Sequence, residues 1–136
     1  MSADEQLERL ARIVVDCGYH LHYDLGPGLL ESAYEILLRE LLVEQGLNVR
    51  CQVVVPIRYR HIAIDNAFKI DLLVENRLVV ELKSVDKIVP LHGKQLLTYL
   101  RLMHLPLGLL INFGQVMFKD GVQRIVNRHS GTIGKG

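Results

Sequence analysis

The sequence predicts an α/β domain in which helices flank a mixed β-sheet. Apolar residues recur at helical spacing before residue 46, and from Val49 onward they alternate with a period of two. After a third helical segment, a nearly continuous apolar run over residues 107–113 is typical of a strand covered on both faces. Because 136 residues is an ordinary size for one domain, we expect residues 1–136 to form a single one.

Two helices are expected at the N-terminus. Ser2 followed by Glu5 is a capping-box pattern, and it opens an N-terminal helix within residues 1–24. Gly26-Pro27-Gly28 interrupts the helical pattern, and a second helix is expected over residues 29–45. Gly46 stands where a helix commonly ends in a left-handed residue.

A sheet is expected in the second half of the chain. Its first three strands form an antiparallel meander at residues 49–59, 62–74 and 78–84. Pro90 suits the first position of a crossover helix over residues 91–104, which leads to the strand at 107–113. Two short strands near 115–119 and 122–127 complete the sheet, and the Gly-rich residues 130–136 are expected to form a flexible tail.

The charge balance excludes a strongly basic or acidic protein. Lys and Arg number 16 and Asp and Glu 15, for a formal net charge of +1, so any nucleic-acid binding must come from a local patch. Candidates for a phosphate path, each equally an ordinary surface charge, are Arg58, Arg60, Lys69, Arg124 and Arg128. Apolar residues make up 49%, which leaves room for an oligomer interface and makes a homodimer plausible.

No apolar run approaches the roughly 20 residues of a membrane-spanning helix. The first residues lack the basic start and apolar core of a secretory signal, which favours a cytoplasmic location. Cys17 and Cys51 are too few for a metal cluster, and we expect both to be buried thiols rather than a disulfide.

Two acidic residues and a lysine mark a candidate site in the meander. Glu81 and Lys83 lie on one face of a strand because side chains alternate, and Leu82 points the other way. If residues 75–77 form a three-residue loop, Asp71 falls opposite Glu81 on the neighbouring strand. A two-residue loop would send the two carboxylates to opposite faces, so the site depends on the register.

Adjacent carboxylates repel each other unless a cation neutralises them. Magnesium keeps several waters, so Asp71, Glu81 and the main-chain carbonyl of Leu82 would be enough to hold it. Lys83 beside the ion could orient a water molecule and stabilise charge on a phosphate, which is the chemistry of phosphodiester hydrolysis. The ordinary alternative is a cross-strand ion pair without catalytic function.

Further motifs resemble the GxxExxY family of the PD-(D/E)xK nuclease superfamily. The naming motif is Gly28-Leu-Leu-Glu31-Ser-Ala-Tyr34, and the other shared segments are Asp71-Leu72-Leu73-Val74, Glu81-Leu82-Lys83, Gln95-Leu96-Leu97-Thr98-Tyr99-Leu100 and residues 108–114. The similarity covers about residues 20–127, and Ile70 stands where the superfamily name has proline.

The resemblance implies a restriction-endonuclease-like core with Asp71 and Glu81 as metal ligands and Lys83 as the catalytic lysine. It adds Glu31 as a further acid and Gln95 as an assisting residue; His92, Gln95 and Tyr99 share one helix face by spacing. The expected cofactor is Mg²⁺, with Mn²⁺ as a substitute, and the expected partner is nucleic acid, with DNA favoured.

Two other hypotheses remain open at the level of sequence. One is a nucleic-acid-binding or assembly module that keeps the fold of a nuclease without turnover, since fold does not fix function. The other is a structural oligomer in which Asp71, Glu81 and Lys83 form only an ion-pair network.

Overall fold

The computed structural model describes residues 1–128; the expected tail at 130–136 lies outside them. The elements in chain order are α1 (Ala3–Leu25), α2 (Glu31–Glu44), β1 (Val49–Tyr59), β2 (Ile62–Val74), β3 (Leu78–Lys83), α3 (Pro90–Met103), β4 (Leu107–Asn112), the 3₁₀ turn η1 (Phe118–Gly121) and β5 (Val122–Val126).

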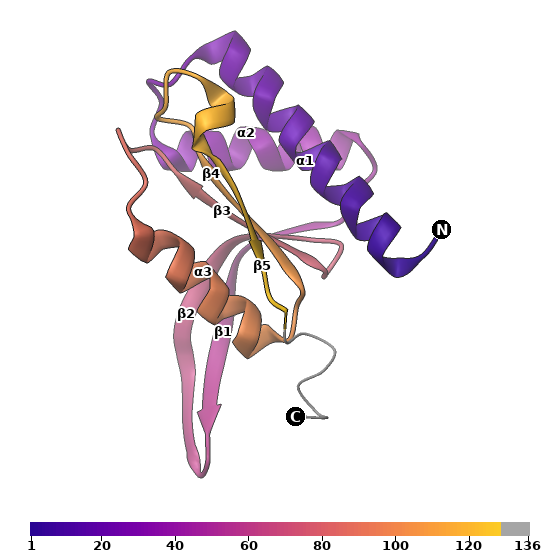
Figure 1. Cartoon of the computed structure of the whole chain (residues 1–136), viewed down its shortest axis with the longest axis vertical. Coiled ribbons are helices and arrows are strands. Elements are labelled where there is room, and N and C mark those ends of the chain that lie inside the picture. The colour runs from indigo at the N-terminus through magenta and orange to yellow at the C-terminus, as the bar shows by residue number, and fades with distance from the viewer. Residues whose placement is uncertain (129–136) are drawn as a thin grey trace.

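The five strands form one mixed sheet in the order β1-β2-β3-β4-β5. Strands β1, β2 and β3 are an antiparallel meander, β3 and β4 are parallel, and β5 runs antiparallel to β4. Helix α3 makes the crossover that a parallel pair requires. Helices α1 and α2 cover one face of the sheet and α3 covers the other (Figure 1). The predicted α/β fold is therefore confirmed.

The helix boundaries follow their local signals. Ser2 Oγ accepts a hydrogen bond from the Glu5 N–H (3.1 Å), and the Ser2 N–H donates to Glu5 Oε1 (3.3 Å), so the predicted capping box is present. Gly46 has a φ of 84° directly after the C-cap of α2, and Pro90 is the first residue of α3. Cys17 and Cys51 are free thiols, as expected; Cys17 is buried, whereas Cys51 is only half-buried.

The prediction of a strand near residues 115–119 is wrong. Residues 118–121 form the 3₁₀ turn η1, and Val116 and Met117 are exposed to 82% and 54% rather than paired in the sheet. Phe118 explains the difference, because its buried ring packs beside Gly18 of α1 and 5.9 Å from the ring of Phe113. The chain leaves the sheet to make this contact, and only β5 pairs with the free edge of β4.

Two apolar cores hold the three layers together. The larger core lies between α1, α2 and the sheet and includes Tyr34, Leu82 and Phe113. The smaller core lies under α3 and includes Ile70 and Leu96. Burying each such side chain contributes about 1.5–3 kcal/mol to the stability of the fold.

Strands β1 and β2 continue beyond the body of the sheet as a two-stranded arm, which is prominent in Figure 1. Their register shifts between Val55 and Ile57, at Pro56, and the ladder then runs out to the pair Tyr59 and Ile62. Residues 58–66 are all exposed, so the arm stands free of either core.

Candidate active site

The register of β2 and β3 is the one that the candidate site requires. Val74 pairs with Leu78 and Leu72 with Val80, and residues 75–77 form the loop between the strands. Continuing this register by one step brings Asp71 opposite Glu81. The prediction that both carboxylates lie together is confirmed.

Backbone pairing between β2 and β3 ends at Leu72 and Val80. Beyond that point the two strands are joined by hydrogen bonds from side chains to the backbone. The Asp71 N–H donates to Glu81 Oε1 (3.0 Å), and the Leu82 N–H donates to Asp71 Oδ2 (2.8 Å). Each carboxylate thus satisfies a backbone donor of the opposite strand. These reciprocal bonds fix two half-buried carboxylates side by side where the strands part.

Leu82 and Lys83 lie as the alternation of a strand requires. The Leu82 side chain is fully buried against α1 and α2, whereas Lys83 and Glu81 are half-buried on the other face. The Phe113 N–H donates to the Lys83 carbonyl (2.9 Å), so the peptide groups of Lys83 face β4. By alternation, the Leu82 carbonyl is directed toward β2, on the side of Asp71 where its own N–H also bonds.

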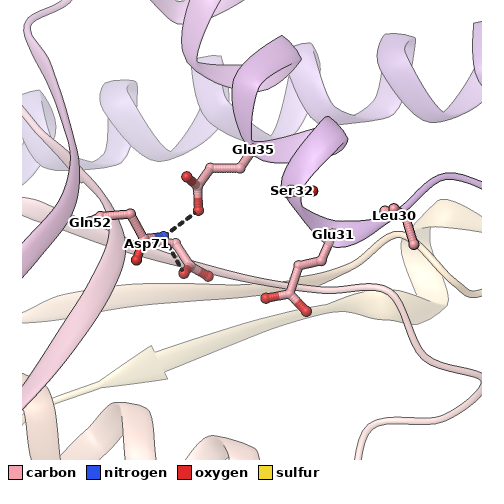
Figure 2. Close-up of a pocket in the computed structure, with 6 residues that line it drawn as sticks. All are labelled: Leu30, Glu31, Ser32, Glu35, Gln52 and Asp71. Carbon is pink, nitrogen blue, oxygen red and sulfur yellow. Dashed lines mark hydrogen bonds between the residues drawn. The ribbon is translucent and has the colours of Figure 1, made fainter.

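Helix α2 adds two further acids above Asp71. A cleft of about 590 Å³ is lined by Leu30, Glu31, Ser32, Glu35, Gln52 and Asp71 (Figure 2). Gln52 Nε2 donates to Glu35 Oε1 (2.7 Å) and to Asp71 Oδ1 (3.2 Å), so one amide bridges two carboxylates.

Glu35 and Gln52 line the site but were not among the residues predicted from the sequence. Glu35 stands four residues after Glu31 on a helix, and this spacing places both on one face, so the signal was available. Gln52 gave no such signal. It has a φ of 50° within β1 and interrupts the ladder opposite Asp71, an unfavourable backbone conformation that costs about 1 kcal/mol or more.

Tyr34 and Ser84 hold the start of α2 in place. The Tyr34 hydroxyl donates to the Gly26 carbonyl and accepts from the Leu29 N–H (3.1 Å). Its ring stacks on Phe113 with the centroids 4.2 Å apart. Ser84, directly after β3, donates its hydroxyl to the Leu29 carbonyl (2.7 Å). Glu31 therefore starts its helix from a segment anchored both to the core and to the strand that carries Lys83.

Burial and neighbouring negative charge raise the pKa of Glu81, Glu31 and Glu35. Burial, followed by the charge of Asp71, raises the pKa of Glu81 to about 8, although the Asp71 N–H and Lys83 oppose the shift. Burial and then Asp71 also raise the pKa of Glu31, while Lys83 lowers it. For Glu35 burial again comes first, and the Gln52 hydrogen bond acts against it. The site carries more negative charge than its own cations balance.

The donor set fits a hard divalent cation that keeps part of its water. Carboxylate and carbonyl oxygens are the ligands that magnesium prefers, and Asp71, Glu81 and the Leu82 carbonyl supply them. Within residues 1–128, no three His, Cys, Asp or Glu side chains are grouped so as to hold a metal by themselves. Binding would therefore rely on the main-chain carbonyl and on water as well as the two carboxylates.

Gln95 lies apart from the acidic cluster. It is exposed on α3 and lines a separate groove of about 340 Å³ with Tyr99 and residues of the β1–β2 arm. Tyr99, which lines this groove, is close enough to the acidic cluster to be affected by its charge. Burial raises the pKa of the Tyr99 phenol, and the charges of Glu81 and Asp71 add to that rise. Of the candidate phosphate contacts, Arg124 is engaged in an ion pair with Glu8.

Comparison with protein families matches residues 8–125 to the PD-(D/E)XK nuclease superfamily. The chain belongs to this superfamily, and its mixed sheet with flanking helices is a restriction-endonuclease-like fold. A search of curated proteins found no match, and a search of solved structures found none either. Membership indicates a nuclease that acts on nucleic acid, and nucleases of this superfamily generally use divalent metals. No helix within residues 1–128 could span a membrane.

Proposed function

We propose that this chain is a divalent-metal-dependent nuclease that hydrolyses phosphodiester bonds of DNA, and that it is one of the GxxExxY proteins. The observation that carries the proposal is the pair of reciprocal hydrogen bonds between Asp71 and the strand of Glu81 and Lys83. An ordinary cross-strand ion pair would not need two carboxylates held against each other at the end of a ladder, beneath a third and a fourth acid.

Asp71, Glu81 and the Leu82 carbonyl are the groups that would hold the ion, which we propose to be Mg²⁺ with Mn²⁺ as a substitute. When bound, such an ion lowers the pKa of water and neutralises charge on the phosphate. The two carboxylates need no rearrangement to serve. Their hydrogen bonds to the Asp71 and Leu82 N–H groups use only one oxygen of Glu81 and leave lone pairs on Asp71 for the ion.

Lys83 lies on the same strand face as Glu81, and its ammonium group can orient the attacking water and stabilise negative charge on the phosphate. Glu31 is the first residue of α2, at the mouth of the cleft, and its raised pKa suits a group that accepts a proton from water. Gln95 lies in the separate groove on α3 and would contact the substrate strand rather than the ion. Cleavage of both strands of a duplex would use two copies of the chain.

The test is a cleavage assay on labelled single-stranded and double-stranded DNA and RNA with Mg²⁺, Mn²⁺ or EDTA. Wild type is compared with Asp71→Asn, Lys83→Ala and the control Glu40→Gln, which alters an exposed acid on α2 paired with Arg39. We expect metal-dependent cutting of DNA that both site variants lose and the control keeps.

Metal binding, measured by calorimetry, separates the alternatives. Asp71→Asn should weaken it and Lys83→Ala should keep it. Cutting that survives in EDTA, or in both site variants, would contradict the proposed site. Nucleic-acid binding with neither metal binding nor cutting would instead support the non-catalytic module.

A further inference from the structure

The tip of the β1–β2 arm is a basic, exposed ribbon. Residues 57–64 include Arg58, Arg60 and His61 and no acid, and Asp65 is the one acid among the exposed residues 58–66 of the arm. The ladder is regular there, with Arg58 paired to Ala63 and Tyr59 to Ile62. A net positive tip on a chain whose formal charge is only +1 is a local concentration of charge.

We propose that this arm binds the phosphate backbone of duplex DNA about one helical turn from the cleavage site, with Arg58 and Arg60 as the contacts. The inference rests on the proposed nuclease function. It adds a binding element to the acidic site and predicts that each copy of the chain contacts the duplex on one side of the scissile bond.

The charges of Arg58 and Arg60 are not neutralised by an ion pair within residues 1–128. Within the part of the chain that the structure describes, Arg39 and Arg124 are ion-paired with Glu40 and Glu8, whereas no carboxylate pairs with Arg58 or Arg60. The Arg60 guanidinium lies 5.3 Å from the centroid of the Tyr59 ring, a cation–π contact that keeps the charge at the tip. Guanidinium groups without an acidic partner are suited to bind phosphate.

A groove lies between the arm and α3. It is lined on the helix side by Lys94, Gln95 and Thr98. At its wall, Phe68 of the arm stacks on Tyr99 of α3 with the ring centroids 4.0 Å apart. Tyr99 in turn lies within the electrostatic influence of Glu81 and Asp71. A nucleic-acid strand that leaves the site along α3 therefore meets polar and basic groups before it reaches the arm.

The length of the arm determines how far from the cleavage site it can contact DNA. Ten residues of β2 separate His61 at the tip from Asp71. At a rise of about 3.3 Å per residue they span about 33 Å, which matches about 10 base pairs at about 3.4 Å each. The arm should therefore contact the duplex about one turn away from the cut, and only on one side.

The experiment compares the double variant R58S/R60S with wild type. The matched control is R9S/R12S, which removes the same charge from exposed positions of α1, on the opposite face of the sheet. Binding to a fluorescent duplex of about 30 base pairs is measured by anisotropy over a salt series. We expect R58S/R60S to bind at least about tenfold more weakly near 0.1 M salt, with a log–log salt slope smaller by about 1.8, since each phosphate contact contributes about 0.9.

Cleavage of a short duplex locates the contact. A substrate that extends only about 5 base pairs to either side of the cut should be cleaved equally by wild type and R58S/R60S, because it does not reach the arm. Equal binding and equal salt slopes for wild type and R58S/R60S would overturn the inference. So would a dimer-to-monomer change in R58S/R60S by light scattering with binding per copy unchanged, because the arm would then be a protein interface. If wild type binds DNA without cutting it, the proposed function fails while the anisotropy comparison still decides the role of the arm.

Discussion

Replacing Glu81 with glutamine should stabilise the metal-free protein in a way that depends on pH. Glutamine keeps an oxygen that can accept the Asp71 N–H but removes a charge that burial, and then the charge of Asp71, disfavours. The pKa of Glu81 is about 8 in the folded chain against an ordinary value of 4.5. Between these values the folded state holds a proton that the unfolded state has released, so the free energy of unfolding falls as pH rises.

The size of the effect follows from the same two values. A rise from 4.5 to about 8 corresponds to a ceiling of ~5 kcal/mol at pH values above the folded pKa. Glu81 is half-buried rather than sealed from water, and solvent and Lys83 reduce that ceiling, so we expect about 1–3 kcal/mol. Below about pH 4.5, wild type and Glu81→Gln should be equally stable, because both are then uncharged at this position.

The assay is urea unfolding in EDTA at about pH 5, 6.5 and 8, with Glu40→Gln as the control for removing an exposed charge. The stability gain of Glu81→Gln over wild type should grow steadily across this series, while the control stays flat. Adding Mg²⁺ at pH 8 should stabilise wild type and narrow the gap. A constant difference between wild type and Glu81→Gln at all three pH values would refute the electrostatic account of the site.

Three more substitutions test other parts of the structure. Lys83→Ala should lower the cleavage rate at least about 100-fold, measured in single-turnover assays, because it removes the positive charge beside the carboxylates. Tyr34→Phe should cost about 1–3 kcal/mol in urea unfolding, because it leaves the partly buried Leu29 N–H and Gly26 carbonyl without their partner; an unchanged midpoint would contradict the anchoring role. Gly114→Ala should cost about 3 kcal/mol or prevent folding, because its Cβ would stand 2.2 Å from the Val85 carbonyl oxygen. Gly28→Ala, with nothing within 4 Å of the added Cβ, is the matched control and should have a normal thermal midpoint.

The sequence predicted the elements that have strong local signals. The Ser2 and Glu5 capping box, Gly46 and Pro90 each mark a boundary by their own chemistry, independent of the rest of the fold. The register of β2 and β3 was predictable for a similar reason, because the loop at residues 75–77 and the alternation of apolar residues agree on one pairing. That agreement is enough to place Asp71 opposite Glu81.

What the sequence did not predict depends on contacts between distant segments. Residues 115–119 alternate enough to suggest a strand, yet Phe118 packs against α1, which begins more than 90 residues earlier. Gln52 joins the site through a positive φ that no local pattern indicates. Asn112 is a third example: its buried side chain bonds to the backbone of Val85 and Gly114 and so fixes the connection that follows Lys83.

The Gly28, Glu31 and Tyr34 motif divides into residues with different physical roles. Gly28 has neither a positive φ nor a neighbour that an added Cβ would meet, so neither backbone strain nor packing in this structure requires glycine there. Tyr34 is fully buried and anchors the segment before α2 through its hydroxyl. Of these three motif residues, only Glu31 lines the cleft that contains Asp71. Tyr34 is thus a positioning residue whose loss should affect stability and the placement of Glu31 together, whereas Glu31→Gln should leave stability almost unchanged and lower cleavage. A Glu31→Gln variant that unfolded more easily than Tyr34→Phe would show that these roles are reversed.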